Sequence, residues 1–413
     1  MPNTTIRSRL AFTSTQKKVL LALASMVGLR MLGLFLVLPV FTLYGLQFTT
    51  SKFLVGFAFG AYALVMAILQ IPMGRLSDRI GRRKVLVMGM TLFSAGSFLC
   101  ALPPMFPHSW QIWVLICGRL VQGGGAIISV AFATVADYIE ADRRSTAMAV
   151  LGIPIGVSFV VGIVGGPILA GWFGTAFLFW LTGFLGLATD FLLVRYLRDE
   201  RPEREPPAPM AEVFAHPPLV AYAMGGFLIN FFMTTFFFHF PLIVTGQHHM
   251  KMTQYYMLLL PMMVISAVTM FGFSQGADKG WARLLAALAY LMFIPSFVLL
   301  FKPAWLGQNP QSLIPVFLAG TLFYIGFTGL EPILPSLVSR ASPASSYGTA
   351  LGFYNTAQFL GSAVGGPLAG ALANFPPERT LSIMLAAAAI GFLLMAATPS
   401  PVRAETEITP SGS

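Results

Sequence analysis

Two related stretches of sequence decide the fold, VGGPILAG at residues 164–171 and VGGPLAG at 364–370. They lie 200 residues apart, and the same offset relates Asp78 to Asp278. Each pair falls at a corresponding place in a series of long apolar segments, so we expect six segments to repeat in the same orientation. Two parallel halves of this kind are related by an axis along the membrane normal, which is an architecture of carriers.

The composition places the chain in a membrane. Of its 413 residues, 56% are hydrophobic and only 10% are charged, compared with about 45–50% and about 25% in soluble domains. The net charge of +10 would suggest a nucleic-acid partner for a soluble protein. Here the basic residues lie in short clusters between apolar runs, so no nucleic-acid partner is expected. Cys100 and Cys117 lie in apolar segments without metal-ligand spacing and are expected to be small buried side chains.

Twelve segments are long and apolar enough to cross a bilayer, which takes about 20 residues each. The predicted spans are 19–44, 53–73, 84–103, 109–137, 145–170, 173–195, 216–245, 253–274, 281–301, 311–339, 346–373 and 379–398. The predicted fold class is an all-α membrane protein with twelve transmembrane helices in two parallel pseudo-symmetric six-helix bundles. The predicted division is an N-terminal bundle at 1–195, a cytoplasmic linker at 196–215, a C-terminal bundle at 216–398 and a disordered tail at 399–413.

The distribution of basic residues predicts the orientation. With twelve spans both termini lie on one side, and 19 of the 25 Lys and Arg residues belong to the tails and loops of that side. The opposite side holds only Lys52, Lys251, Lys302 and Arg379. Because cytoplasmic loops carry the excess of Lys and Arg, the sequence predicts a multi-pass protein of the cell inner membrane with both termini in the cytoplasm.

Several motifs resemble one family of transporters. GRLSDRIGRRK at 74–84 resembles the signature loop between spans two and three of the major facilitator superfamily. GRLVQGGGA at 118–126 and GIVGGPILAG at 162–171 resemble motifs of its proton-coupled drug-efflux branch, the second being the antiporter motif of span five. GLRMLGLFLVLPVFTLYG at 28–45 and GLEPILPSLVSRASP at 329–343 are similar to bacterial inner-membrane members. The resemblance covers nearly the whole chain and implies a twelve-span carrier that works by alternating access as a single chain.

The resemblance also implies a conformational latch in the 74–84 loop. In the family, the loop aspartate lies near the N-terminus of span eleven, here around Ser345–Tyr347. A carboxylate at a helix N-terminus contributes about 0.3–2 kcal/mol, which is weak enough to release. The predicted latch, which favours the outward-open state, consists of Gly74, Asp78, Arg79, Arg82, Arg83 and, as a weaker copy facing span five, Asp278. For the basic residues alone, anchoring of the loop on the cytoplasmic side is the alternative interpretation.

Ionisable residues within spans suggest function, because each costs about 2.5–3.5 kcal/mol on insertion scales. The predicted proton-coupling residues are Glu331, Arg30, Arg119 and His239. Glu331 lies in mid-span, where a carboxyl group could bind and release a proton; a permanent ion pair with an arginine is the alternative. Either arginine could interact with Glu331 in one conformation only, which is what coupling requires. His239 titrates in a useful range, although a structural hydrogen bond would also explain it.

Two further acids are expected to be structural. Asp190 is near enough to Arg195 in sequence for an ion pair. Asp137, at the end of span four, is expected to face Arg143 or Arg144 in a structural or gating role.

Other residues of the spans are candidates for the substrate cavity or for helix packing. Polar side chains that could line a cavity are Tyr62, Gln70, Gln122, Asn230, Asn355 and Gln358, although helix–helix hydrogen bonds would explain any single one of them. The residues expected to bring helices close together and seal the outer half are Gly162, Gly166, Pro167, Gly366 and Pro367.

We therefore expect a secondary transporter that exports a small amphipathic compound or drug in exchange for protons. Uptake of a small polar solute by proton symport and a lipid-handling carrier are the alternatives. A membrane enzyme is disfavoured because the five histidines are scattered, and a channel is disfavoured by the repeat. The chain has no G-x-x-x-x-G-K-[ST] segment, so no bound nucleotide is expected. No metal cofactor is expected either, because the histidines and cysteines have no partners at ligand spacing. The expected partners are the small-molecule substrate, protons and the lipid bilayer.

Overall fold

The computed structural model describes residues 12–140, 143–198, 213, 215–342 and 347–398. The predicted tail at 399–413 and most of the predicted linker at 196–215 lie outside these residues. All regular secondary structure in the described part is helical.

The long helices follow the predicted spans closely. The first bundle contains α2 (Ser14–Val37), α4 (Lys52–Ile80), α5 (Arg82–Ala101), α6 (His108–Gly123), α7 (Ile128–Tyr138), α8 (Arg144–Phe173) and α9 (Thr175–Tyr196). The second contains α11 (Pro217–Gly246), α12 (Tyr256–Gly276), α13 (Ala282–Phe301), α14 (Ile314–Ala341), α15 (Tyr347–Leu372) and α16 (Pro377–Ala397). Short helical segments α3 (Phe41–Gly45), η1 (Pro103–Met105), η3 (Met252–Gln254), η4 (Ala277–Trp281) and η5 (Pro303–Leu306) connect some of them.

These helices make twelve spans in the described part of the chain. Ten stretches are long and apolar enough to cross a membrane, and one of them, Met252–Phe301, contains both α12 and α13. Helix α15 supplies the remaining span, and α6 and α7 together form span four. The predicted twelve-helix fold in two six-helix bundles is thus confirmed.

The sequence repeat has a counterpart in the turns. Gly81, between α4 and α5, has φ of 103°, and Gly280, between α12 and α13, has φ of 97°. Residues with a Cβ atom rarely adopt such angles. The same sharp turn therefore follows the second helix of each bundle.

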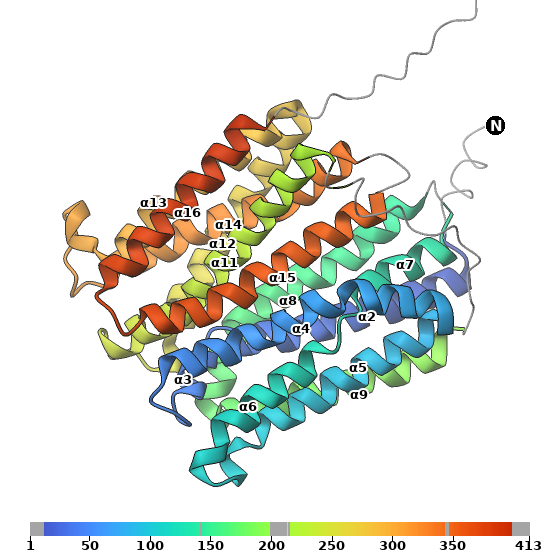
Figure 1. Cartoon of the computed structure of the whole chain (residues 1–413), viewed down its shortest axis with the longest axis horizontal. Helices are drawn as coiled ribbons and strands as arrows, with labels where there is room; N and C mark the ends of the chain where they lie inside the picture. The colour runs from blue at the N-terminus through green and yellow to red at the C-terminus, as the bar shows by residue number, and fades with distance from the viewer. Residues whose placement is uncertain (1–11, 141–142, 199–212, 214, 343–346, 399–413) are drawn as a thin grey trace, which may run out of the picture.

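Successive helices run back and forth along one direction (Figure 1), so the two bundles share two end faces. We call the end where α2 begins at Ser14 and α16 ends at Ala397 the terminal face, and the opposite end the distal face. Helices α4 and α15 lie side by side where the bundles meet (Figure 1).

The bundles touch closely in their distal halves. A Cβ atom at Gly56 of α4 would overlap the carbonyl oxygen of Gly366 on α15, and one at Gly366 would overlap the backbone of Gly56. The Lys52 ammonium donates a hydrogen bond to the carbonyl oxygen of Ala373 (2.9 Å). A Cβ atom at Gly171 of α8 would overlap Thr253 of η3. Contact between the distal ends therefore comes from both α4 with α15 and α8 with η3.

The terminal halves of the same helices are less enclosed. On α8, α12 and α15, a Cβ at Gly156, Gly272 or Gly352 would meet no described atom of a neighbouring helix within 4 Å. Asp78, at the terminal end of α4, has a side chain that is 41% exposed. Among the described residues, the close contacts between the bundles given above thus lie in the distal half.

Candidate functional site

A buried cluster in the first bundle is built around Arg30 of α2. Its side chain is 1% exposed, and Nη2 donates hydrogen bonds to the Tyr62 hydroxyl (2.6 Å) and to the carbonyl oxygen of Gly125 (3.0 Å). Gly125 lies in the break between α6 and α7, where the helix no longer uses all of its carbonyl groups. The guanidinium group also lies 5.4 Å from the ring centre of Phe93, so the first bundle holds this charge with polar and aromatic contacts.

Arg119 of α6 joins the same cluster. Its guanidinium group lies 4.8 Å from the ring centre of Tyr62 and 5.1 Å from that of Phe41, both favourable for a cation over an aromatic ring. It donates a hydrogen bond to Gln122, whose amide donates in turn to Ser97 (2.8 Å). Arg119 is only 6% exposed. Tyr62 therefore faces two buried positive charges.

The cluster combines residues that we had assigned to two roles. Arg30 and Arg119 were predicted for proton coupling, whereas Tyr62 and Gln122 were predicted for the cavity. Among the described residues, neither arginine has a carboxylate within ion-pair distance, and Arg30 Nε and Nη1 lack hydrogen-bond partners. The four residues form one positively charged unit.

Glu331 lies apart from this unit, on α14 of the second bundle. Its side chain is partly exposed and acts electrostatically on the hydroxyl of Tyr354 on α15. No ion pair joins it to an arginine within the described part of the chain. The permanent ion pair that we weighed as an alternative is therefore not present in this structure.

Helix α15 presents further polar groups near Glu331. Tyr354 is 1% exposed, and its hydroxyl accepts a hydrogen bond from Gln358 (3.2 Å). Both side chains reach α11 at Gly226, where a Cβ would lie 2.6 Å from the Tyr354 ring. Asn355 is partly exposed on the same helix. The predicted residue Gln358 thus belongs with Glu331, and Tyr354 is a member that sequence analysis missed.

The other predicted cavity residues occupy different environments. Asn230 donates a hydrogen bond to the carbonyl oxygen of Gly226 one turn earlier on α11 (3.2 Å). Gln70 of α4 is 1% exposed, and neither atom of its amide has a hydrogen-bond partner among the described residues. Gln70 thus has unused hydrogen-bonding capacity within the first bundle.

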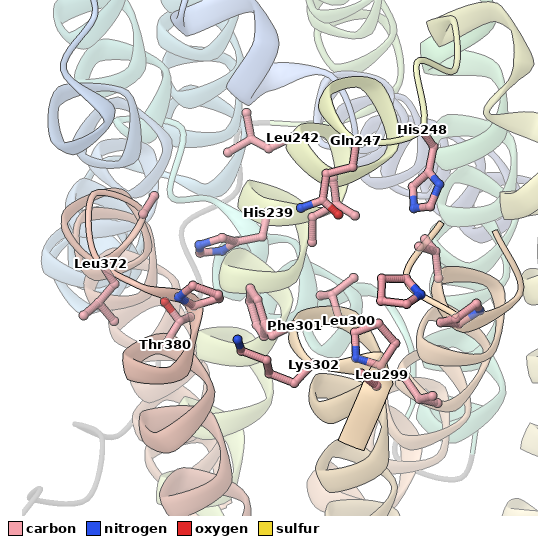
Figure 2. A pocket seen from close by; sticks show the side chains of 18 of the residues that line it. His239, Leu242, Gln247, His248, Leu299, Leu300, Phe301, Lys302, Leu372 and Thr380 are labelled. Atoms are coloured by element: carbon pink, nitrogen blue, oxygen red, sulfur yellow. The ribbon is translucent and has the colours of Figure 1, made fainter. Parts of the chain in front are cut away.

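His239 lies near the distal end of α11. Its Nδ1 is 3.0 Å from the carbonyl oxygen of Thr235, and its ring meets that of Phe301 edge to face at 5.1 Å. It lines a half-open cavity of about 480 Å³ together with Lys52 and Lys302, and Figure 2 shows His239 and Lys302 in its wall. His239 is thus grouped with the distal face rather than with Glu331 or the arginine cluster.

The signature loop at 74–84 is tied to its own bundle by Arg82. This buried side chain pairs with Asp78 (2.7 Å) and with Asp137 at the end of α7 (2.8 Å). Asp137 was expected to pair with Arg143 or Arg144; the structure shows Arg82 as one of its partners, and Arg143 also pairs with Glu140 (3.0 Å). The loop brings Arg82, which is 55 residues away in sequence, to the end of α7.

The structure describes only part of the rest of the predicted latch. Gly74 lies in α4 facing Ser129, Arg79 is exposed, and Arg83 donates to the carbonyl oxygen of Leu197 (3.4 Å). The proposed partner of Asp78, around Ser345–Tyr347, falls on residues 343–346 and the Tyr347 side chain, which lie outside the described part. The structure therefore shows how the loop is held within its bundle.

Asp278 has a partner in its own bundle. Its carboxylate lies 3.9 Å from Arg340 at the end of α14, and the predicted contact with span five stays a prediction. This contact joins the loop after span eight to the end of span ten. The Arg82–Asp137 pair joins the loop after span two to the end of span four, so the two halves repeat a contact with the charges exchanged.

Two other expectations need correction. Asp190 accepts a hydrogen bond from Thr91 of α5 (3.0 Å), whereas Arg195 lies over the ring of Tyr196. Cys100 is buried as expected, but Cys117 is exposed on α6. Helix periodicity explains the second error, because an apolar span has both a packed face and an outward face.

The glycines of the repeated motif bring helices close together. A Cβ at Gly162 or Gly166 would overlap Phe35 and Leu36 of α2, so α8 packs directly on the backbone of α2. Pro167 lies within α8 in the same stretch. In the second copy, Gly366 meets α4 of the other bundle, and Pro367 lies beside Gly60 there. The two copies therefore pack differently, one within a bundle and one between bundles.

The known proteins that this chain resembles are transporters. The profile of the Major Facilitator Superfamily matches residues 23–366. The inner membrane transport protein YajR of Escherichia coli is 33% identical over 87% of this chain and 78% of its own length. The multidrug resistance protein MdtL of Klebsiella pneumoniae is 24% identical over 83% of this chain and 86% of its own.

Solved structures share the fold at low sequence identity. A D-xylose–proton symporter matches with a TM-score of 0.75 at 17% identity, covering 93% of this chain and 98% of its own. A bacterial homologue of the human lysosomal transporter Spinster, in an inward-facing and unoccupied conformation, matches with a TM-score of 0.70 at 16% identity, covering 94% and 98%.

Proposed function

The chain belongs to the major facilitator superfamily, and from this premise we propose that it is a proton-coupled antiporter that exports a small amphipathic compound. The observation that carries the proposal is the environment of Glu331. This carboxyl group lies in a membrane span, is partly exposed, and has no ion-pair partner among the described residues. A carboxyl group held by an arginine in every conformation would stay charged, whereas this one is free to exchange a proton.

The arrangement of charges supports coupling. The first bundle carries the positive unit of Arg30 and Arg119, and the second carries Glu331. When the bundles rock, the electrostatic potential that the arginines produce at Glu331 changes. A proton can bias a conformational equilibrium only if its affinity differs between the two states. Separating the charges onto two moving bodies provides such a difference.

The proton gradient is large enough for export. One proton that crosses 100 mV releases about 2.3 kcal/mol, which sustains about a fifty-fold gradient of a neutral substrate. Neither a nucleotide nor a metal is needed for this energy conversion, and the proposal includes no enzymatic step.

The test is transport by the Glu331→Gln variant in proteoliposomes with an imposed pH gradient. We expect it to lose proton-driven transport and to keep substrate binding. Asp190→Asn is the matched control, since Asp190 is another acid within a span but bonds to Thr91, and it should keep proton-driven transport. Full proton-coupled activity of Glu331→Gln would remove this residue from the mechanism.

The same assay separates antiport from the alternatives. In antiport, substrate moving out of the vesicle is expected to carry protons in. Symport of a small polar solute would move both in the same direction, and a lipid carrier would change the lipid distribution between leaflets. The D-xylose–proton symporter shares this fold, so the fold leaves the direction open and the assay decides it.

We further propose that the terminal face is cytoplasmic, so that the close contacts between the distal halves of the bundles lie toward the outside. The support is the excess of Lys and Arg in the loops of that face. A fluorescent protein that folds only in the cytoplasm, fused after Ser413, should fluoresce; alkaline phosphatase fused there should be inactive. In this orientation, Asp78 and its neighbours are the proposed latch on the cytoplasmic side.

A further inference from the structure

The half-open cavity beside His239 lies away from the residues that we propose for coupling. It is formed where the distal ends of α11, α13, α14, α15 and α16 meet, and α4 contributes Lys52. Its volume is about 480 Å³, which is within the range of small-molecule sites. Figure 2 shows His239, Lys302 and Thr380 around one side of it. Since the cavity lies at the distal ends of these helices, we expect its ligand to arrive from the side opposite to the chain termini.

The polar part of the lining is cationic. Lys52 uses one hydrogen bond to the carbonyl oxygen of Ala373, and an ammonium group has two further N–H donors. Lys302 pairs with Glu378. Lys52 and Lys302 thus carry two positive charges, and Glu378 balances one of them. The polar side of the cavity therefore has an excess positive charge.

Neutral polar groups add donors beside the lysines. His239 is not one of these donors, because its Nδ1–H is used by the carbonyl oxygen of Thr235 and Nε2 of the neutral ring is an acceptor. Thr380, which is 1% exposed, places a hydroxyl group in the lining. His248 and Gln247 lie at the end of α11 in the same wall. An anionic head group is the ligand part that this set of donors suits.

The remaining wall is apolar. It includes Leu242, Leu299, Phe301, Val316 and Leu372. A bare inorganic anion would leave these side chains in contact with water, whereas a ligand with an apolar body would cover them. The lining therefore fits an apolar body attached to a single negative charge.

We propose that this cavity is a binding site for an amphipathic organic anion, and that its occupation stabilises the closed distal face. Lys52 is the contribution of the first bundle to the lining, and the other lining residues belong to the second. A ligand that binds the Lys52 ammonium therefore bridges α4 and the second bundle, beside the hydrogen bond from Lys52 to Ala373. The distal face can open only when the interaction between the ligand and Lys52 is broken.

Binding is tested with 4-phenylbutyrate on the full chain in nanodiscs of phosphatidylcholine, by isothermal titration calorimetry. The anion is expected to bind, and 4-phenylbutanol and 4-phenylbutylamine are expected to bind at least tenfold more weakly. Lys52→Gln should weaken binding of the anion at least tenfold. Lys251→Gln, which removes an exposed lysine outside the cavity, should leave it unchanged.

The source of the head group is tested with anionic lipid. If a lipid supplies it, phosphatidylglycerol in the nanodiscs will compete with 4-phenylbutyrate; if a soluble anion does, it will not. Equal affinity for the acid and the alcohol, or equal affinity of the Lys52→Gln and Lys251→Gln proteins, would overturn the proposal. The test needs no transport, so its outcome is independent of the role of Glu331.

The effect on conformation is measured as a distance. Spin labels at Thr50 and Asn374, in a chain with Cys100→Ser and Cys117→Ser, report the separation of the distal ends. Saturating 4-phenylbutyrate is expected to reduce the population with a long distance, and Lys52→Gln should abolish that response. An increase in the long-distance population would refute the stabilising role.

Discussion

Phe159 of α8 stacks on Phe327 of α14, with ring centres 5.7 Å apart and planes inclined by 22°. The same ring meets Tyr324 edge to face at 6.2 Å and Phe35 of its own bundle at 4.9 Å. One phenylalanine of the first bundle thus inserts among aromatic rings of the second, near the middle of both helices. This contact links the bundles nearer to the middle of the helices than the glycine contacts of α4 and α15 do.

Phe159→Ala is expected to weaken closure of the distal half. Aromatic pairs contribute about 0.5–1.5 kcal/mol each beyond simple burial, so losing the pairs with Phe327 and Tyr324 should cost the closed state about 1–3 kcal/mol. The Thr50–Asn374 distance distribution should then gain a long component. Phe184→Ala is the control, because Phe184 meets only Phe98 and Trp180 of its own bundle in the aromatic contacts of the described part. The same shift in both variants would mean that the interbundle contact has no special role.

Gly366→Ala is expected to separate α4 from α15. The new methyl group would overlap the backbone of Gly56 and Gly60, and backbone atoms cannot rotate away as a flexible side chain can. The overlap is relieved only when the helices move apart, so the distal face should open. Gly352→Ala lies on the same helix with no atom within 4 Å and should leave the distances unchanged. Spin-label distances and transport measure both; an unaltered distance in Gly366→Ala would show that the helices are not closely packed there.

Sequence analysis predicted the fold well because its signals are local. Twelve apolar stretches, a repeated glycine motif and the charged loop at 74–84 need no knowledge of contacts. Partners were harder to predict, because they depend on where helices far apart in sequence meet. Asp137 was assigned to arginines six or seven residues away, and nothing in the sequence indicated that Arg82, 55 residues away, pairs with it.

The candidate site shows the same limit. Arg30 and Arg119 were recognisable as charges within spans, and Tyr62 as a polar side chain, but nothing in the sequence indicates that both arginines face one ring. Tyr354 was missed because a tyrosine in an apolar span is usual, and its position beside Glu331 follows from the packing of α15 on α14. The cavity at His239 joins six separate segments, so no single stretch of sequence indicates it.

Asp137→Asn is expected to destabilise the protein more than Asp78→Asn. The Asp137 side chain is 13% exposed and that of Asp78 is 41% exposed, while their common partner Arg82 is 4% exposed. Removing one partner of a buried pair costs about 3–5 kcal/mol, whereas exposed pairs contribute about 0–1 kcal/mol. Thermal unfolding in detergent should rank the variants in that order. If both variants melted at the same temperature as the unaltered protein, Arg82 would rely on neither acid.

Asp78→Asn tests the proposed latch in a different way. If Asp78 stabilises the outward-open state by contacting span eleven, its neutralisation should reduce that state while melting changes little. An interaction of about 0.3–2 kcal/mol corresponds to about a two- to thirtyfold change in population. A bulky thiol reagent applied from outside to a cysteine placed in the distal half of the interface between the bundles, away from the glycine contacts of α4 and α15, should react more slowly in the variant. Arg79→Gln alters an exposed charge of the same loop, so it shows whether a general loss of loop charge has the same effect. Unchanged reactivity in Asp78→Asn would argue against the latch.

Tyr62→Phe is expected to destabilise the first bundle more than Tyr44→Phe does. Both hydroxyl groups are buried and bonded: that of Tyr62 accepts from the charged Arg30 (2.6 Å), and that of Tyr44 donates to the carbonyl oxygen of Cys100 (2.9 Å). Hydrogen bonds to a charged group contribute about 1.5–3 kcal/mol and neutral ones about 0.5–1.5 kcal/mol. Arg30 already has two nitrogens without acceptors among the described residues, so the loss of the Tyr62 hydroxyl would leave its charge held mainly by Gly125. Thermal unfolding of the two variants in the same detergent measures the difference. A larger loss for Tyr44→Phe would show that water or a bound anion, rather than Tyr62, stabilises the Arg30 charge.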